Sequence, residues 1–384
     1  MVLITISLTY MTRTKIVIAS VLKPVYEPRM YEKIGITLSK NPLLDVHVVG
    51  YGNVNETPAM AMKATGLGLF KRLSLKRLLA PWKIFRLLNQ QKPAIAIACT
   101  HELLFPFVLH ALLHPSVRLV YDVQENYYLN ILHTHAFPSL LRWPIASWVR
   151  LKEKILLPFY SKVISAEQCY LTEMPFIIDK AEVVANKAVI DPFIAEKRDN
   201  RVKSERTCLL FSGTVSEEYG IYEAIGLAEL LHAADSSFYL RIIGYCANDN
   251  ERHKLQLFLK NKSFVVCDSL DQPVAHTLIL EAIAQADWGM MAYSENKATR
   301  DRIPTKLYEY MSYRLPVLST NNLVWQELIT HYDAGLCINY RQTHLDLLTR
   351  LLKLTGFYKS NADFNELLWN TEEQKLVSLM NNKY

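Results

Sequence analysis

The order of apolar segments constrains this chain more than any other feature of its sequence. Short, uninterrupted apolar runs alternate with longer stretches of helical period. Uninterrupted apolarity is typical of strands that are buried on both faces, as in a parallel sheet covered by helices. The alternation therefore predicts an α/β fold with doubly wound sheets. The expected strands are Lys15–Ser20, Val46–Gly50, Ile95–Cys99, Leu119–Asp122, Val163–Ser165, Cys208–Ser212, Tyr239–Ile243, Phe264–Cys267, Trp288–Tyr293, Val317–Ser319 and Leu336–Ile338.

These strands fall into two series, and 384 residues are enough for two domains. The polar segment Glu196–Arg206 has one apolar residue, Val202, and is expected to be a surface linker. We therefore expect Rossmann-like domains over residues 1–195 and 206–370, with a cleft between them and a helix within 371–384 packing back on the first. Ligands of such sheets bind beyond the carboxyl ends of the strands.

Several protein classes are excluded by simple counts. No apolar run reaches about 18 residues, so no membrane-spanning helix is expected. The six cysteines are scattered without a CxxC pair, which argues against disulfide frameworks and structural zinc and fits a reducing cytoplasm. Residues 1–12 lack a basic start and make a poor secretory signal, so we interpret them as an extra tail, with Met11 a plausible true start.

The net charge is +6, and it is distributed unevenly. From Thr57 to His101 there is no Asp or Glu, although the stretch holds eight Lys and Arg residues. Segments 66–92 and 137–160 combine such cations with Leu, Phe and Trp, which predicts contact with an anionic membrane surface. The alternative is that both helices pack on the sheet and expose basic outer faces. Nucleic-acid binding is not expected, because no RNA-binding motif accompanies the basic residues.

The segment TRDRIPTKLYEYMSYRLPVLST, from Thr299, holds the most informative residues. Pro304 suits the first turn of a helix, and the N–H groups of residues 303–306 with the helix dipole suit an anion such as a diphosphate. Lys306 adds a positive charge. Glu309 lies one turn later, where a carboxylate accepts hydrogen bonds from two ribose hydroxyls. The alternative is an ordinary Lys–Glu pair on a solvated helix face.

This segment resembles the retaining glycosyltransferases of the GT-B fold, specifically glycosyltransferase family 4 (group 1), which carry a P-x-K-x-x-E-Y-M-x-x-G-x-P-V pattern. Arg314 stands where the family usually has Gly. The resemblance implies an N-terminal acceptor domain and a C-terminal nucleotide-sugar donor domain. It also implies that Glu309 holds the donor ribose and that Asp301, eight positions earlier, lies near the donor sugar. The matching residues are Pro304, Lys306, Glu309, Tyr310, Met311, Pro316 and Val317.

A second match, CLLFSGTVSEEYGIYEAIG from Cys208, reads as strand, turn and helix. It is similar to the family's G-R-x-x-x-x-K-G, with both glycines in place, as Gly213 and Gly220. Thr214 and Tyr219 replace the Arg and Lys that in the family clamp the donor diphosphate. Either nearby cations substitute for them, or the activity is weakened or lost. The expected donor-binding residues are Gly213, Thr214, Gly244, Arg302, Pro304, Thr305, Lys306 and Glu309, and the candidate substitute cations are Lys306, Arg302 and Arg300.

Polar residues also follow two strands of the first series. His101 and Glu102 open a helix after one strand, and Gln124, Glu125 and Asn126 follow the next, ahead of two tyrosines. Polar groups with aromatic planes suit sugar recognition, although helix capping explains them equally. The resemblance implies that His101 lies near the reacting sugars and the other four residues bind the acceptor. No metal site and no cofactor besides the nucleotide-diphosphate sugar are expected.

The sequence thus predicts an enzyme of class EC 2.4. It is expected to transfer a hexose or N-acetylhexosamine, with retention, to a glycan or lipid-linked glycan. Its expected place is surface polysaccharide or lipopolysaccharide synthesis, in the cytoplasm or at the inner face of the cytoplasmic membrane. Two alternatives stay open: a GT-B sugar-nucleotide epimerase, and an inactive GT-B scaffold or partner subunit, which Thr214 and Tyr219 favour.

Overall fold

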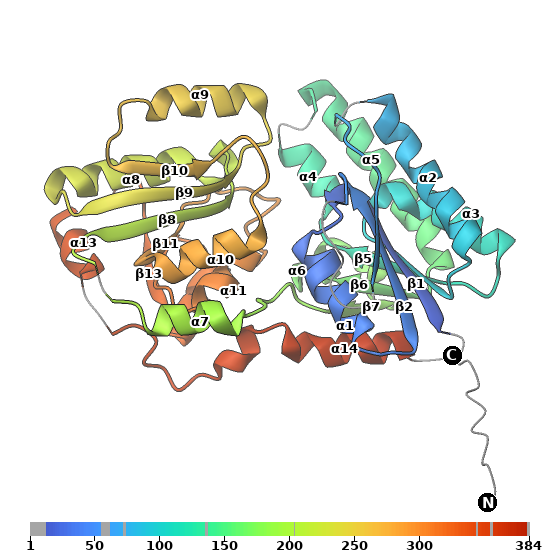
Figure 1. The fold of residues 1–384 in the computed structure, drawn as a ribbon. Coiled ribbons are helices and arrows are strands. Elements are labelled where there is room, and N and C mark those ends of the chain that lie inside the picture. The colour runs from blue at the N-terminus through green and yellow to red at the C-terminus, as the bar shows by residue number, and fades with distance from the viewer. Residues whose placement is uncertain are drawn as a thin grey trace, which may run out of the picture. The chain divides into compact units, whose positions relative to one another are not determined.

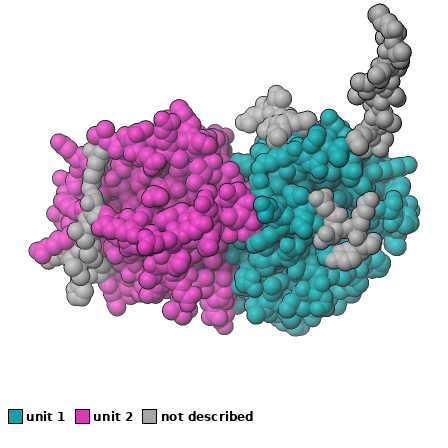
Figure 2. Space-filling model, turned by 90° about the horizontal axis from the view of Figure 1, so that it is seen from below, with its two compact units in different colours: residues 1–185, 373–384 teal, residues 186–372 magenta. Residues whose placement is uncertain are grey.

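The computed structural model describes residues 13–54, 62–71, 74–134, 137–202, 204–342, 345–353 and 356–381. The chain forms two compact units (Figures 1 and 2): unit 1 contains residues 1–185 and 373–384, and unit 2 contains residues 186–372. Each unit is built on one parallel sheet with helices packed against it, which confirms the α/β fold class. The tail at residues 1–12 lies outside the described residues.

Unit 1 has a seven-stranded sheet in the order β3-β2-β1-β4-β5-β6-β7, with every neighbouring pair parallel. The chain order reverses between β1 and β4, which is the switch point of a doubly wound sheet. The strands are β1 (Thr14–Pro24), β2 (Leu44–Tyr51), β3 (Lys63–Gly66), β4 (Ile95–Ala98), β5 (Arg118–Val123), β6 (Lys162–Ser165) and β7 (Ala181–Val183). The helices are η1 (Pro28–Gly35), α1 (Ile36–Ser39), α2 (Leu75–Gln91), η2 (His101–Leu103), α3 (Leu104–Leu113), α4 (Tyr127–His133), α5 (Ser139–Leu156), η3 (Leu157–Phe159), α6 (Cys169–Glu173), η4 (Pro175–Ile177) and α14 (Asn370–Asn381).

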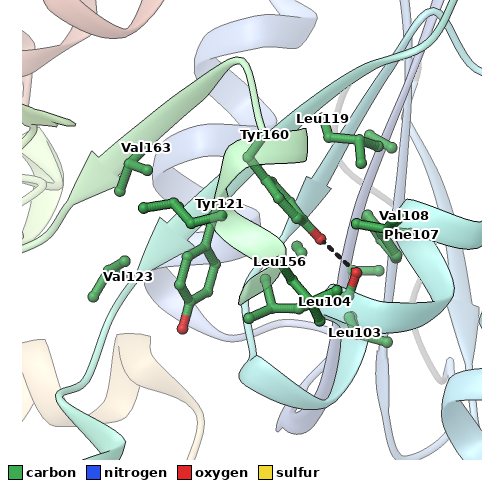
Figure 3. Packing of buried hydrophobic residues seen from close by; sticks show 14 of the residues in the cluster. Leu103, Leu104, Phe107, Val108, Leu119, Tyr121, Val123, Leu156, Tyr160 and Val163 are labelled. Atoms are coloured by element: carbon green, nitrogen blue, oxygen red, sulfur yellow. Dashed lines mark hydrogen bonds between the residues drawn. The ribbon is translucent and has the colours of Figure 1, made fainter. Parts of the chain in front are cut away.

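The core of unit 1 follows the two-residue period of its strands. Val17 and Ala19 of β1 belong to one apolar cluster with residues of α2 and α3, while the alternate Ile16 and Ile18 are equally buried. The sheet is therefore covered on both faces. Figure 3 shows part of this cluster, where the Tyr160 hydroxyl donates a hydrogen bond to the carbonyl of Leu104 at 3.1 Å.

The terminal helix α14 completes unit 1. Glu373 accepts an ion-pair contact from Lys40 at 2.5 Å, directly after α1. The Arg118 guanidinium on β5 donates to the carbonyls of Met380 and Leu379 at 2.9 and 3.3 Å. Leu376 is fully buried. The last residues of the chain are thus part of the first sheet's covering layer.

Unit 2 has a six-stranded parallel sheet in the order β10-β9-β8-β11-β12-β13, with its switch point between β8 and β11. The strands are β8 (Thr207–Thr214), β9 (Phe238–Tyr245), β10 (Val265–Ser269), β11 (Trp288–Met291), β12 (Val317–Thr320) and β13 (Gly335–Ile338). The helices are α7 (Pro192–Asp199), η5 (Glu217–Tyr219), α8 (Ile221–Ala234), α9 (Asp249–Leu259), α10 (His276–Gln285), α11 (Thr305–Ser312), α12 (Leu323–His331), α13 (Leu345–Leu352) and η6 (Phe364–Leu367).

The segment expected as a linker, Glu196–Arg206, is not one. Its first residues belong to α7, and Arg198 donates to the carbonyls of Ala284 and Ala286 at the end of α10. Arg201 forms an ion pair with Asp287 at 3.0 Å. The cations of this segment, which the sequence suggests are solvated, therefore attach it to unit 2. The two units divide after residue 185, which is ten residues before the expected boundary at 195.

Candidate functional site

The carboxyl ends of β8 and β9 in unit 2 are held in very close approach. Gly213 at the end of β8 has a φ of +87°, and a Cβ added at Gly244 on β9 would lie 1.8 Å from the Gly213 carbonyl oxygen. Both positions thus require glycine. Because β8 borders the switch point, this is the edge where ligands of such sheets bind. Thr214, the next residue, is exposed.

Gly220, which precedes α8, is fixed by its surroundings. Its φ is +76°, and an added Cβ would lie 1.7 Å from the Ala292 carbonyl oxygen beyond β11. Gly220→Ala is therefore expected to destabilise the protein by at least about 2 kcal/mol, since a left-handed conformation and a backbone clash are combined. Gly226→Ala in the middle of α8, where an added Cβ meets nothing within 4 Å, is the control and should stabilise by up to about 1 kcal/mol. Denaturant unfolding measures the free energy of unfolding of both variants. If Gly220→Ala were as stable as Gly226→Ala, the predicted clash at Gly220 would be contradicted.

Lys306 on α11 points at the end of β8. Its ammonium donates to the Ser212 carbonyl at 2.6 Å and lies over an aromatic cage formed by Phe211, Tyr219 and Tyr293, 5.2–5.8 Å from the three ring centroids. Burial lowers the pKa of Lys306 from 10.5 to about 8, although Glu309 partly offsets this. Lys306 is therefore a desolvated cation held at the switch point beside Gly213, 3.6 Å from where a Cβ at that glycine would lie.

Tyr219 supplies one of the three rings of the aromatic cage around Lys306. It occupies the position where the resembling family has a cation, and its ring packs edge-to-face on Tyr293, with centroids 4.9 Å apart. The sequence shows that the family's cation is absent at this position. It does not show that the tyrosine in its place contacts Lys306. The cage was missed because its three rings come from β8, η5 and the residues after β11.

Glu309 is one turn from Lys306 and is largely buried. Its Oε1 lies 2.8 Å from Nε2 of His276, the first residue of α10. Sequence reasoning missed His276, since it precedes Glu309 by 33 residues in a segment without a recognisable motif. An isolated, solvated Lys306–Glu309 pair is therefore not what the structure contains.

The other expected donor-side residues lie around the start of α11. The helix begins at Thr305, so Pro304 is its N-cap residue and does not lie in the first turn as expected, and no described side chain caps this end. The Thr305 hydroxyl accepts a hydrogen bond from the Asn186 amide at 2.6 Å. The backbone carbonyl of Arg302 accepts one from the Trp325 indole at 2.6 Å.

Asp301 lies apart from the buried residues. Its side chain is 46% exposed and pairs with its neighbour Arg300, Nε to Oδ2, at 3.3 Å. Arg300 lines a pocket of about 230 Å³ beyond β11, β12 and β13. The pocket wall is polar and includes Asn296, Thr299 and Asn322. Asp301 thus lies on the loop between β11 and α11 that supplies one wall of the pocket.

In unit 1, His101 follows β4 at the switch point of that sheet. Its Nδ1 lies 2.8 Å from the Lys152 ammonium, which donates, and its ring packs edge-to-face on Tyr127. Burial lowers the pKa of His101 to about 4, so the ring is neutral at physiological pH. Glu102 forms an ion pair with Arg77 at 2.6 Å. Burial opposes its charge, but the Arg77 guanidinium holds the pKa of Glu102 below its ordinary value.

The residues after β5 have partners within unit 1. Asn126 caps α4 and also donates to Glu173, while Glu125 pairs with Lys23 at 2.5 Å. Gln124 donates to Asp122 at 2.7 Å, and Asp122 is itself buried in an ion pair with Arg29 on η1. These contacts are those of a helix-capping loop; the acceptor-binding role expected for Gln124, Glu125, Asn126 and Glu102 stays a prediction.

Among the residues that the structure describes, no group of three or more His, Cys, Asp or Glu side chains is placed to hold a metal ion. All six cysteines are free. Of the described helices, none is long and apolar enough to cross a bilayer.

A comparison with known protein families matches the part of the chain that holds the candidate site of unit 2. Residues 193–366 match the family model described as "Glycosyl transferases group 1", a range that includes Gly213, Lys306 and Glu309. No curated protein matches the sequence.

Solved structures similar to the chain include Anabaena HepE in complex with UDP and glucose, with a TM-score of 0.65 at 14% identity over 97% of this chain and 100% of HepE. Sucrose-phosphate synthase from Thermosynechococcus elongatus gives 0.62 at 12% identity, covering 96% and 95% of the two chains. The UDP-forming α,α-trehalose-phosphate synthase of Burkholderia xenovorans with glucose-6-phosphate gives 0.62 at 10% identity, over 96% and 100%.

At these identities the likeness concerns the fold, which is the α/β fold of GT-B glycosyltransferases. The family match covers most of unit 2 and holds the cation, the carboxylate and the close strand ends described above. Residues 193–366 of this chain, which make up most of unit 2, therefore match the model of the glycosyl transferases group 1 family.

Proposed function

We propose that this protein is a retaining glycosyltransferase of family 4 that uses a nucleotide-diphosphate sugar. The observation that carries the proposal is that α11 places two buried charged groups one turn apart at the switch point of unit 2: Lys306, which donates to the Ser212 carbonyl, and Glu309, which lies beside His276. Anabaena HepE, which shares the fold, is described in complex with UDP-glucose. In this proposal the N-terminus of α11 and Lys306 bind the diphosphate, and Glu309 accepts hydrogen bonds from the ribose.

The chemistry assigned to this site is mainly electrostatic. The acceptor hydroxyl attacks the anomeric carbon on the face that the diphosphate leaves, so the configuration is retained. As the bond between that carbon and the diphosphate oxygen breaks, the hydroxyl proton passes to the departing phosphate. Lys306 stabilises the negative charge that develops on the departing phosphate, and its low-dielectric surroundings strengthen that interaction. Gly213, Thr214 and Gly244 are assigned to the phosphates and base, and Arg302, Pro304, Thr305 and Asp301 to the remaining donor contacts. No metal is assigned a step.

The residues of unit 1 are assigned to the acceptor. His101, neutral because its pKa is about 4, offers a hydrogen bond to a sugar hydroxyl without adding charge. Glu102, Gln124, Glu125 and Asn126 supply further polar groups. The transferred sugar is proposed to be a hexose or N-acetylhexosamine, and the acceptor a glycan or lipid-linked glycan of surface polysaccharide or lipopolysaccharide synthesis, made at the cytoplasmic side of the membrane.

Thermal-shift titration with UDP, GDP, ADP, CMP and their sugars, with and without Mg²⁺, tests the proposal. A ligand at about 100 times its Kd stabilises the folded protein by about 2.7 kcal/mol, which a melting curve resolves. One nucleotide and its sugar should shift the melt in the wild type and not in Glu309→Ala. A shift that survives in the variant contradicts the assignment of Glu309.

One observation favours a second candidate function. Thr214 is exposed and Tyr219 is aromatic, so neither position supplies the cation that the resembling family has there. An inactive scaffold or partner subunit would show no thermal shift with any nucleotide sugar. That result, obtained on folded protein, would replace the transferase proposal.

A further inference from the structure

The outer faces of three helices in unit 1 expose an unusual number of large apolar side chains. Helices α2, α3 and α5 are neighbours packed against the same sheet (Figure 1). We call their outward-facing surface the α2–α3–α5 face. Its most exposed members include Leu140 at 91%, Leu75 at 77% and Trp143 at 68%. Its further exposed apolar residues are Leu78, Leu79, Trp82, Phe105, Leu112, Leu113, Leu141, Trp148, Leu151 and Ile155.

Helical spacing shows that this exposure is organised. On α2, the buried residues Ala80, Ile84 and Leu88 repeat every four positions and pack in the core. The exposed Leu75 and Trp82, seven positions apart, lie on the opposite side of the helix. An ordinary surface helix presents polar residues on that side. The second apolar stripe is therefore not explained by the fold of unit 1.

The three helices lie side by side, α2 next to α3 and α3 next to α5. The Trp82 ring on α2 packs edge-to-face on Phe105 of α3, with centroids 6.4 Å apart, and both side chains remain about half exposed. On α5, Trp148 and Ile155 are again seven positions apart and share one exposed side, whereas the buried Val149 and Leu156 lie about 100° further around the helix. Single exposed apolar residues are normal on proteins, whereas a large contiguous set marks an interaction site.

The charges on the α2–α3–α5 face have one sign. Exposed cations are Lys76, Lys83 and Arg86 on α2 and Lys154 on α5. The three helices contain a single acidic residue, Glu153, whose side chain is 1% exposed and accepts a hydrogen bond from Tyr121 in the interior. The surface thus combines Leu and Trp with lysine and arginine and offers no exposed carboxylate on its helices.

We propose that the α2–α3–α5 face docks on an anionic lipid bilayer, with its helices lying in the plane of the headgroups. Leu and Phe side chains enter the acyl boundary, Trp rings occupy the interface, and the cations contact lipid phosphates. Charge complementarity selects this occupant. The docking stands independently of the proposed glycosyl transfer, although it would bring a lipid-linked acceptor to the enzyme.

Vesicle co-sedimentation of the full-length protein, without nucleotide, tests the proposal. Vesicles of phosphatidylcholine mixed with the anionic phosphatidylglycerol are compared with vesicles of phosphatidylcholine alone, at low and at high salt. The wild type should bind the anionic vesicles and be released from them in part by salt. Absence of binding by folded protein overturns the proposal, and it does so without bearing on nucleotide-sugar binding.

Two variants and one control locate the surface. Replacing Lys76, Lys83 and Arg86 by Gln should weaken partitioning roughly 10²-fold, since each cation near an anionic surface contributes about 1 kcal/mol. Replacing Leu78 and Trp148 by Gln should also weaken it, by removing apolar contacts. The control replaces Lys254, Lys260 and Lys359, exposed cations of unit 2, by Gln and should bind like the wild type.

The remaining outcomes decide against the proposal. If both variants bind vesicles as the wild type does, another surface is responsible. If the wild type is a dimer in light scattering and the Leu78 and Trp148 substitutions make it monomeric, the α2–α3–α5 face covers a second copy of the chain instead. Melting temperatures of all variants should match the wild type within a few degrees, because the substituted apolar side chains, Leu78 and Trp148, are 70% and 64% exposed.

Discussion

Glu309→Ala is expected to reduce sugar transfer to below about 1% of wild type while the fold is retained. Hydrogen bonds to a charged group contribute about 1.5–3 kcal/mol each, so losing two ribose contacts weakens donor binding by at least about 10²-fold. Oε1 of the buried carboxylate lies 2.8 Å from Nε2 of His276. Donor affinity by calorimetry and kcat/KM with the nucleotide sugar found by thermal shift measure the effect.

Two further variants separate the role of Glu309 in binding from its role in packing. Glu327→Ala removes an exposed carboxylate from α12 of the same unit and should leave donor affinity unchanged. His276→Gln removes the imidazole beside Glu309 but keeps the carboxylate, so it should retain most of the affinity for the donor. Wild-type transfer by Glu309→Ala would refute the assignment, as would an equal loss in His276→Gln.

Lys306→Gln is expected to lower the affinity for the nucleotide diphosphate by about 10- to 100-fold, the equivalent of one charged hydrogen bond. It should also remove a pH dependence. Burial lowers the pKa of Lys306 to about 8, so the free protein loses this charge as the pH rises through 8. A diphosphate prefers the charged form, and wild-type affinity should therefore fall between pH 7.5 and about 9.5.

Isothermal titration of the nucleotide diphosphate across that pH range measures both effects. The Lys306→Gln profile should be weak and flat, because the titrating ammonium is absent. Lys297→Gln, which removes an exposed cation from the same β11–α11 connection, should keep the wild-type slope. A slope that persists in Lys306→Gln would assign the pH dependence to another group.

Much of the fold was predictable because buried parallel strands appear in a sequence as short, uninterrupted apolar runs. All eleven expected strands are present. β3 and β7, at the two edges of the unit 1 sheet, were missed because they are three or four residues long and lack buried apolar residues. The segment from Glu196 was misjudged for a different reason. Its arginines bind carbonyls at the end of α10, and sequence gives no sign of such distant acceptors.

The candidate site was predictable where its residues share one helix. Lys306 and Glu309 lie one turn apart, so their joint presence could be inferred from spacing alone. Their surroundings could not, since the aromatic cage and His276 come from segments that meet only after the sheet of unit 2 has formed. Sequence spacing predicts which side chains are neighbours along a helix. Which distant side chains surround a buried charge is determined by the packing of the whole domain.

The path of α14 has a consequence for biosynthesis. Unit 1 begins with the first strand, but most of its last helix, from Glu373 onward, comes from residues that follow unit 2 in the chain. A chain emerging from the ribosome therefore cannot finish unit 1 until the residues of unit 2 and of α14 have been synthesised, although domains commonly fold in order from the N-terminus. Until then, Arg118 lacks the two carbonyls that it contacts in the folded protein. Nascent chains stalled before Leu376 should accordingly be captured by chaperones through the first sheet, even when unit 2 is already complete.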